Sequence, residues 1–124
     1  MRGSIRAFTS GGAWTYTNLY SFQGGNDGIL PEGYLVLDSK GSLYGTTSTG
    51  GGSSDAGIAF KLSPLLQEGD AWTETVLHNF LAPEGTGDNG GLVWGKWNEL
   101  YGVTYLGGTG CPTQGCGTVF ELRP

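Results

Sequence analysis

The chain has 124 residues, the length of a single domain that can bury a modest core. Glycine supplies 25 positions, far above the usual share of about 7%. The 4 Trp, 6 Tyr and 5 Phe exclude a disordered chain, which would be poor in aromatic residues. A formal charge of -5, with 6 Lys and Arg, excludes a nucleic-acid-binding surface. No apolar run reaches the roughly 18–20 residues that a membrane-spanning helix needs.

One pattern occurs twice in the chain. Four landmarks recur in the same order at offsets of 57 to 60 residues: 14–22 at 72–80, 35–36 at 92–93, 43–45 at 100–102, and 60–64 at 120–124. A repeat of this size indicates an array of like units, each too small to bury a core alone.

Each copy of the pattern predicts four short strands. Thr, aromatic and β-branched residues alternate at period two, and clusters of Gly, Asn, Asp and Pro separate the runs. The predicted strands are 14–22, 34–37, 42–47 and 57–62 in the first copy, and 72–80, 92–94, 99–105 and 117–122 in the second. Residues 5–10 resemble 58–63 and are interpreted as the last strand of a preceding unit.

These elements predict an all-β fold of two four-stranded antiparallel meanders, similar to β-propeller blades. Unit one spans 14–64 and unit two spans 72–124, within a single repeat domain at 5–124. Residues 1–4 look like a vector-derived start, with no leader sequence after them. Since propellers have roughly four to eight blades, we expect a homo-oligomer in which several chains complete a ring: a trimer would give six blades and a tetramer eight.

The landmarks resemble a known family, the bacterial GloVer tandem repeats of large secreted or surface-anchored proteins. The matching motifs are W-T-x-T-x-L-x-x-F at 72–80, G-L-V at 91–93, L-Y-G-T-T at 43–47, G-C-G-T-V-F ending at Phe120, and a closing L-x-P at 122–124. The resemblance implies a repeat β-fold and an extracellular or cell-surface location, and it brings no catalytic residue. Residues 56–59 read Ala-Gly-Ile-Ala where the pattern has Cys-Gly-Thr-Val, so a disulfide is not expected in the first unit.

Cys111 and Cys116 are the only cysteines and lie in the loop before the last predicted strand. A disulfide between them fits a secreted protein. The alternative is a metal site, which would need two further ligands, and His78 is the only histidine. We expect the disulfide, with no metal and no cofactor.

Two Gly-rich loops carry Asp beside Asn, at 26–27 and at 88–89. Carboxylate and amide oxygens next to Gly are suited to calcium. The preferred interpretation is an Asx turn that satisfies its own backbone, because no Asp-x-Asp-x-Asp run accompanies them. Calcium binding stays open.

Glu84, Asp88 and Glu99 are the acids available for glycan cleavage, which requires two carboxyl groups about 5–10 Å apart. Surface solvation explains them equally well. His78 occupies the position of Tyr20 in the other copy and no nucleophile motif accompanies it, so a packed strand residue is expected.

Trp94, Trp97 and Tyr105 replace Leu37, Lys40 and Ser48 of the first copy. Aromatic faces at loop edges stack on sugar rings or anchor protein partners, and they also pack in oligomer interfaces.

The function expected from the sequence is a non-catalytic extracellular repeat module, structural or adhesive, that binds carbohydrate or protein through these aromatic residues. One alternative is a secreted glycan-active enzyme. Another is an inactive scaffold or fragment of a longer propeller.

Overall fold

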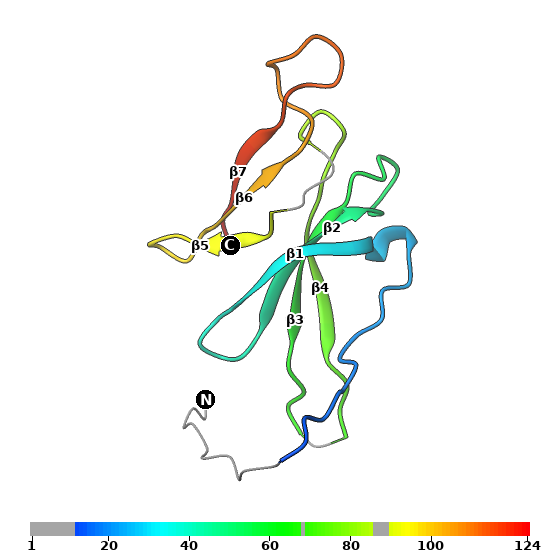
Figure 1. Ribbon diagram of the computed structural model, residues 1–124, viewed down its shortest axis with the longest axis vertical. Helices are drawn as coiled ribbons and strands as arrows, with labels where there is room; N and C mark the ends of the chain where they lie inside the picture. The colour runs from blue at the N-terminus through cyan, green and yellow to red at the C-terminus, as the bar shows by residue number, and fades with distance from the viewer. Residues whose placement is uncertain (1–11, 68, 86–89) are drawn as a thin grey trace.

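The computed structural model describes residues 12–67, 69–85 and 90–124, which form two antiparallel β-sheets (Figure 1). Within these ranges the only helical element is a single 3-10 turn, η1 (Gly25–Asp27). The all-β prediction is therefore confirmed. Nothing in the described ranges forms a helix with the length and apolar character required to cross a membrane. The predicted strand at 5–10 lies outside the described residues.

The strands follow one another in chain order within each sheet. Sheet 1 contains β1 (Ile29–Leu37), β2 (Leu43–Thr49), β3 (Ile58–Ser63) and β4 (Thr73–Asn79), in the order β1-β2-β3-β4. Sheet 2 contains β5 (Leu92–Trp94), β6 (Leu100–Thr104) and β7 (Thr118–Leu122), in the order β5-β6-β7. Each of the seven strands overlaps a predicted segment, but β1 begins at Ile29, five residues before the predicted strand 34–37.

The grouping of strands into sheets differs from the prediction by one strand. The fourth strand of sheet 1 is β4, which belongs to the second copy, and it pairs with β3 from Ile58↔Asn79 to Ser63↔Thr73. Residues 14–22, predicted to be the first strand of unit one, join neither sheet of the described chain. In Figure 1 the blue segment passes outside both sheets before it reaches η1.

The side chains at the end of this segment explain the difference. Phe22 packs edge-on against Phe60 of β3 with ring centroids 5.0 Å apart, so the chain crosses the face of sheet 1 and does not run along its edge. Asn18 also accepts a bond from the backbone N–H of Tyr20 at 3.2 Å, a local bond that competes with strand pairing. A strand persists only where a partner strand receives its backbone groups.

Each sheet has a front face and a rear face, because successive strand side chains point to opposite sides. We call the side that carries Phe60 in sheet 1 and Phe120 in sheet 2 the front face. The rear face carries Ala59 in sheet 1 and Val119 in sheet 2. The core between the sheets joins the rear of sheet 1 to the front of sheet 2: Ala56, Ala59 and Phe80 pack with Phe120 and Leu122. A second cluster lies on the front of sheet 1: Ile58, Phe60 and Leu62 with Tyr20, Phe22, Leu43 and Trp72.

Both front faces are built around a glycine beneath an aromatic ring. A Cβ on Gly45 would lie 2.8 Å from Cζ of Phe60, and a Cβ on Gly102 would lie 2.5 Å from Cζ of Phe120. Leu35 and Leu92 complete these contacts. The two sheets therefore share one packing arrangement at corresponding positions.

Candidate functional site

One cleft lies between the two sheets and is lined by residues of the β1–β2 and β5–β6 turns. It has a volume of about 660 Å³. Its lining combines aromatic, basic and apolar side chains: Leu37, Asp38, Ser39, Lys40, Tyr44, Lys61, Leu77, Trp94, Asn98, Leu100, Leu122, Arg123 and Pro124. Three cations, Lys40, Lys61 and Arg123, lie in this lining with the Asp38 carboxylate and two aromatic rings.

Trp94 is the sequence-predicted residue that lies in the cleft. Its indole Nε1 donates a hydrogen bond of 2.8 Å to the backbone oxygen of Leu37. Its ring meets Tyr44 edge-on with centroids 4.9 Å apart, and Nζ of Lys61 lies 5.8 Å from the Tyr44 ring centroid. Trp94 thus ties β5 to the end of β1, so its first role is to hold the two sheets together.

Asp38 organises the turn at the first-sheet side of the cleft. One carboxylate oxygen accepts from the N–H groups of Lys40 and Ser42, each at 2.9 Å, and the other accepts from the Tyr44 hydroxyl at 2.9 Å. Burial pushes the pKa of Asp38 upward, but these bonds and the charge of Lys61 outweigh it and hold the pKa below its usual value. Burial, together with the bond to Asp38 and its charge, raises the pKa of Tyr44 to about 12.

Glu99 performs the same task in sheet 2. It accepts from the backbone N–H of Trp97 at 2.7 Å and from the Tyr101 hydroxyl at 3.0 Å. Burial acts to raise the pKa of Glu99, but the hydrogen bonds and the charge of Arg123 prevail and lower it. Glu99, weighed from sequence as a glycan-cleaving acid, is therefore a turn anchor.

Trp97 and Tyr105 lie at opposite ends of β6. Trp97 is 72% exposed in the β5–β6 turn, with Nζ of Lys96 at 5.9 Å from its ring centroid. Tyr105 is 70% exposed and directly follows Thr104. Tyr105 lies five positions after Leu100 along the strand, a distance of roughly 16 Å. The structure thus brings Trp94 and Trp97 to one end of sheet 2 and leaves Tyr105 at the other.

A cluster of Tyr20, Asp27 and Glu74 joins the two copies on the front of sheet 1. The Tyr20 hydroxyl donates to Asp27 at 2.7 Å and reaches Glu74 Oε1 at 3.4 Å. Asp27 also accepts from the N–H of Gln23 at 2.6 Å. Glu74 Oε2 is buried and accepts from no donor of the described chain.

The titration of this cluster follows from its burial. Burial, then a hydrogen bond and repulsion from Asp27, raises the pKa of Glu74 to about 7. Burial also acts to raise the pKa of Asp27, but its bonds to Glu74 and Tyr20 lower it overall. Below about pH 7, Glu74 therefore holds a proton, which it donates to Asp27. Sequence reasoning missed this cluster because Tyr20 and Glu74 occupy different positions of the two copies, and only the crossing of residues 14–22 over sheet 1 joins them.

His78 and Glu84 form the corresponding pair beside sheet 2. His78 Nε2 lies 3.1 Å from Glu84 Oε1, and Glu84 Oε2 accepts from the N–H of Leu81 at 2.6 Å. This repeats the arrangement of Tyr20, Asp27 and the Gln23 N–H. Both carboxylates fix the loop that follows the first segment of a copy, residues 14–22 or 72–80. Asp88, the third acid considered from sequence, lies outside the described residues.

The oxygen-bearing side chains of the first Gly-rich loop bind the protein itself. Asp27 is engaged as described, and Asn26 accepts from the N–H of Gly52 at 3.2 Å. The residues at 88–89 lie outside the described residues. Across 12–67, 69–85 and 90–124, no three His, Cys, Asp or Glu side chains gather in a way that could hold a metal ion.

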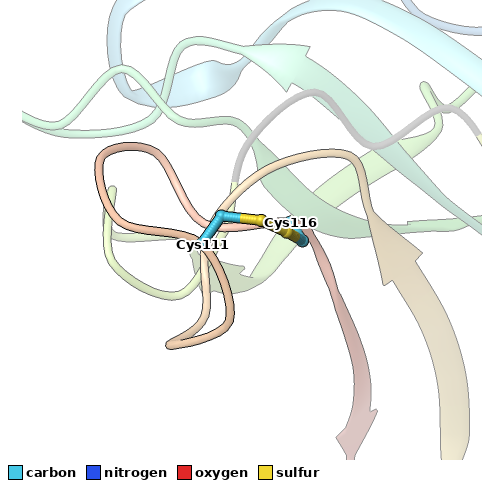
Figure 2. The surroundings of a disulfide bond; sticks show 2 residues. All are labelled: Cys111 and Cys116. Carbon is cyan, nitrogen blue, oxygen red and sulfur yellow. A yellow bond between two sulfur atoms is a disulfide. The ribbon is translucent and has the colours of Figure 1, made fainter.

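Cys111 and Cys116 form a disulfide in the loop between β6 and β7, with Cα atoms 5.3 Å apart (Figure 2). The predicted pairing is confirmed. A bridge between Gly107 and Gly115 closes the base of this loop. A second cleft, of about 750 Å³, lies between the loop and the Ala82–Pro83 turn.

The fold and these sites define an all-β chain of two stacked antiparallel sheets whose carboxylates mostly anchor turns. No protein-family model, curated protein or solved structure matches it. The resemblance to GloVer repeats therefore stays a prediction.

Proposed function

We propose that the chain is a non-catalytic structural module that assembles with other copies of itself, sheet stacked on sheet. The observation that carries this proposal is a contrast in exposure. The rear of sheet 2 faces solvent, and the front of sheet 1, which Tyr20 and Phe22 cover in part, leaves Leu35 exposed.

The rear of sheet 1 is closed, and the front of sheet 2 is closed at Leu92 and partly buried at Phe120 and Leu122. Ala59 and Thr46, which pair across β2 and β3 on the rear face, are 0% and 1% exposed. Leu92 on the front of sheet 2 is 1% exposed.

The counterparts of these residues are open. Val119 and Val103, paired in the same way on the rear of sheet 2, are 78% and 44% exposed. Leu35, the front-face counterpart of Leu92, is 54% exposed. An apolar face of this kind marks an interaction site.

Within the chain, the rear face of sheet 1 packs on the front face of sheet 2. The front of sheet 1 in one copy is complementary to the rear of sheet 2 in another copy, because that contact again joins a front face to a rear face. Such a head-to-tail contact is heterologous, so it closes into a ring when the rotation per chain permits. Three or four copies would give six or eight propeller-like units. The disulfide fits an oxidising compartment, which supports an extracellular or cell-surface location for this assembly.

The enzymatic alternative finds little support among the described residues. Glu84 and Glu99 are each held by a backbone N–H and a neighbouring side chain. The close acid pair, Asp27 with Glu74, lines neither of the two clefts.

Carbohydrate binding is the second candidate function, favoured by the cleft that contains Trp94 and by the exposed ring of Trp97 nearby. A glycan array probed with the chain and with Trp97→Ala tests it. Binding of the unmodified chain that Trp97→Ala abolishes supports this function. Absence of binding by the unmodified chain rejects it.

The mass of the particle in solution tests the structural proposal. Light scattering should give a multiple of 13.0 kDa for the unmodified chain. Leu35→Asp or Val119→Asp should lower that mass, because each charges one open face. Leu66→Asp is the matched control, since Leu66 is 93% exposed and lies outside both sheets. A mass of 13.0 kDa at all concentrations would overturn the proposal.

A further inference from the structure

The strand β7 presents an open edge among the described residues. It pairs with β6 on one side, and no described strand occupies the other. In sheet 1 the corresponding edge of β3 is covered by β4. An unpaired edge is a template for another strand.

The backbone groups that face this edge follow from the alternation of β7. The N–H of Thr118 donates to Thr104 Oγ1 at 2.9 Å and so points toward β6. Successive residues alternate, so Val119 and Glu121 point their N–H groups to the open edge. β3 behaves in the same way: the N–H of Ile58 donates toward β2, while Gly57 O accepts from Phe80 on the β4 side.

Residues 14–22 are the sequence counterpart of the strand that covers β3. They share W-T-x-T, a leucine and a closing phenylalanine with residues 72–80. They belong to neither sheet of the described chain, and Tyr16 is 88% exposed.

We propose that residues 14–22 of a second copy of the chain pair with β7, antiparallel, in the way that β4 pairs with β3. This inference rests on the proposed function and assigns the strand and register through which the copies join. Carrying the β3–β4 register over to the corresponding positions pairs Thr118↔Ser21, Val119↔Tyr20, Phe120↔Asn18, Glu121↔Thr17, Leu122↔Tyr16 and Arg123↔Thr15.

The path of the chain after the strand supports this pairing. β4 leaves sheet 1 through Phe80, which packs on Phe120 of the next sheet with centroids 5.1 Å apart. Residues 14–22 end in Phe22, which already packs on Phe60 at 5.0 Å. A second copy with its sheet 1 stacked on the rear of sheet 2 would therefore direct its residues 14–22 to the β7 edge.

The side chains of the added strand fit the surface that they would cover. Trp72 packs on the apolar cluster at the front of sheet 1, and its counterpart Trp14, 95% exposed, would cover Phe120 and Leu122. Tyr16 takes the place of Glu74, so its hydroxyl would approach the His78–Glu84 pair as Glu74 approaches Tyr20.

The occupant is a second copy because a chain's own residues 14–22 lie on the wrong side. Tyr20 and Phe22 hold them against the front of sheet 1, and sheet 2 packs against the rear. The pairing is therefore head to tail between copies.

A proline at Glu121 tests the strand pairing by light scattering and analytical ultracentrifugation. Glu121→Pro removes the N–H that faces the open edge and leaves the β6 ladder intact. Glu121→Ala is the matched control, since both variants lose the contacts of Glu121 with Tyr101 and Arg123. We expect Glu121→Pro to weaken assembly by at least about tenfold relative to Glu121→Ala.

The outcomes separate the two proposals. Loss of assembly in Glu121→Pro alone supports the pairing. Equal assembly of the two variants overturns the pairing and leaves stacked assembly standing. An unmodified chain that is monomeric overturns both.

Cysteine cross-linking checks the register on chains that keep the edge N–H. Leu122→Cys chains mixed with Tyr16→Cys chains should form a disulfide-linked dimer under mild oxidation, because this non-hydrogen-bonded pair places its Cα atoms about 4.5 Å apart. Thr17→Cys in place of Tyr16→Cys shifts the thiol to the other face and should give little dimer. Equal yields would overturn the register.

Discussion

Replacing Glu74 with glutamine should raise the stability of the chain at neutral pH and flatten its pH profile. Burial and the neighbouring Asp27 raise the pKa of Glu74 from 4.5 to about 7 in the folded chain. The unfolded chain releases this proton near the ordinary value. A raised folded pKa means that the folded state holds more protons, so stability falls as the pH rises from about 4.5 to about 7. The glutamine amide carries no such charge and still donates to Asp27.

The size of the effect follows from the shift and from the exposure of the side chain. At about 1.4 kcal/mol per pH unit, the rise in pKa corresponds to about 3 kcal/mol when unscreened. Glu74 is half-buried, so screening by solvent reduces this to about 1–2 kcal/mol. For a chain of this length, we expect Tm to rise by about 4–8 °C at pH 8.

Thermal unfolding followed by circular dichroism between about pH 5 and pH 8 measures this effect. The carboxyl groups of Asp27, Asp38 and Glu99 have lowered pKa values, so their contribution to the free energy of unfolding is lost only as the pH falls below about 4. That contribution therefore does not change between about pH 5 and pH 8. Glu32→Gln, at an exposed position of β1, should keep the slope of the unmodified chain. The reasoning is refuted if Glu74→Gln keeps that slope too.

Three further variants test the packing. Gly102→Ala should destabilise the chain by about 1–3 kcal/mol in urea unfolding, because the added methyl would lie 2.5 Å from Cζ of Phe120; a neutral result would contradict the role of this glycine. Trp94→Phe should cost about 1 kcal/mol, since it loses the Nε1 bond to β1 and keeps the ring contact; an unchanged midpoint would show that the bond adds nothing. The double change Cys111→Ser and Cys116→Ser should cost about 2 kcal/mol by freeing a short loop, and an equal Tm would oppose this.

Local pattern was sufficient to predict the position of most strands and the disulfide. Alternating residues bounded by Gly and Asp place β2, β3 and β6 within a residue or two of their observed ends. The cluster Asp-Ser-Lys-Gly, which separates the predicted strands 34–37 and 42–47, forms the β1–β2 turn, where Asp38 accepts from two backbone N–H groups. These features depend on residues that are close together in the sequence, so they can be predicted from the sequence.

Features that depend on a distant partner were not predictable. Residues 14–22 and β4 share one pattern, yet only β4 forms a strand, because β3 supplies its hydrogen bonds. The Tyr20–Asp27–Glu74 cluster has the same origin, since it arises where one copy crosses the sheet that holds a strand of the other. Trp94 belonged to a set of three aromatic residues in the sequence, and the strand direction of β6 separates it from Tyr105.

Hydrogen exchange of the Thr15 and Thr17 amides tests most directly whether copies join through these residues. The register places both N–H groups on β7 of a neighbouring copy, as Thr73 and Thr75 are placed on β3. The account predicts that their protection rises with chain concentration, in step with that of Val119 and Glu121, and that Glu121→Pro abolishes it. Fast exchange of these amides at every chain concentration, or protection that is independent of concentration, would contradict joining of the copies through residues 14–22.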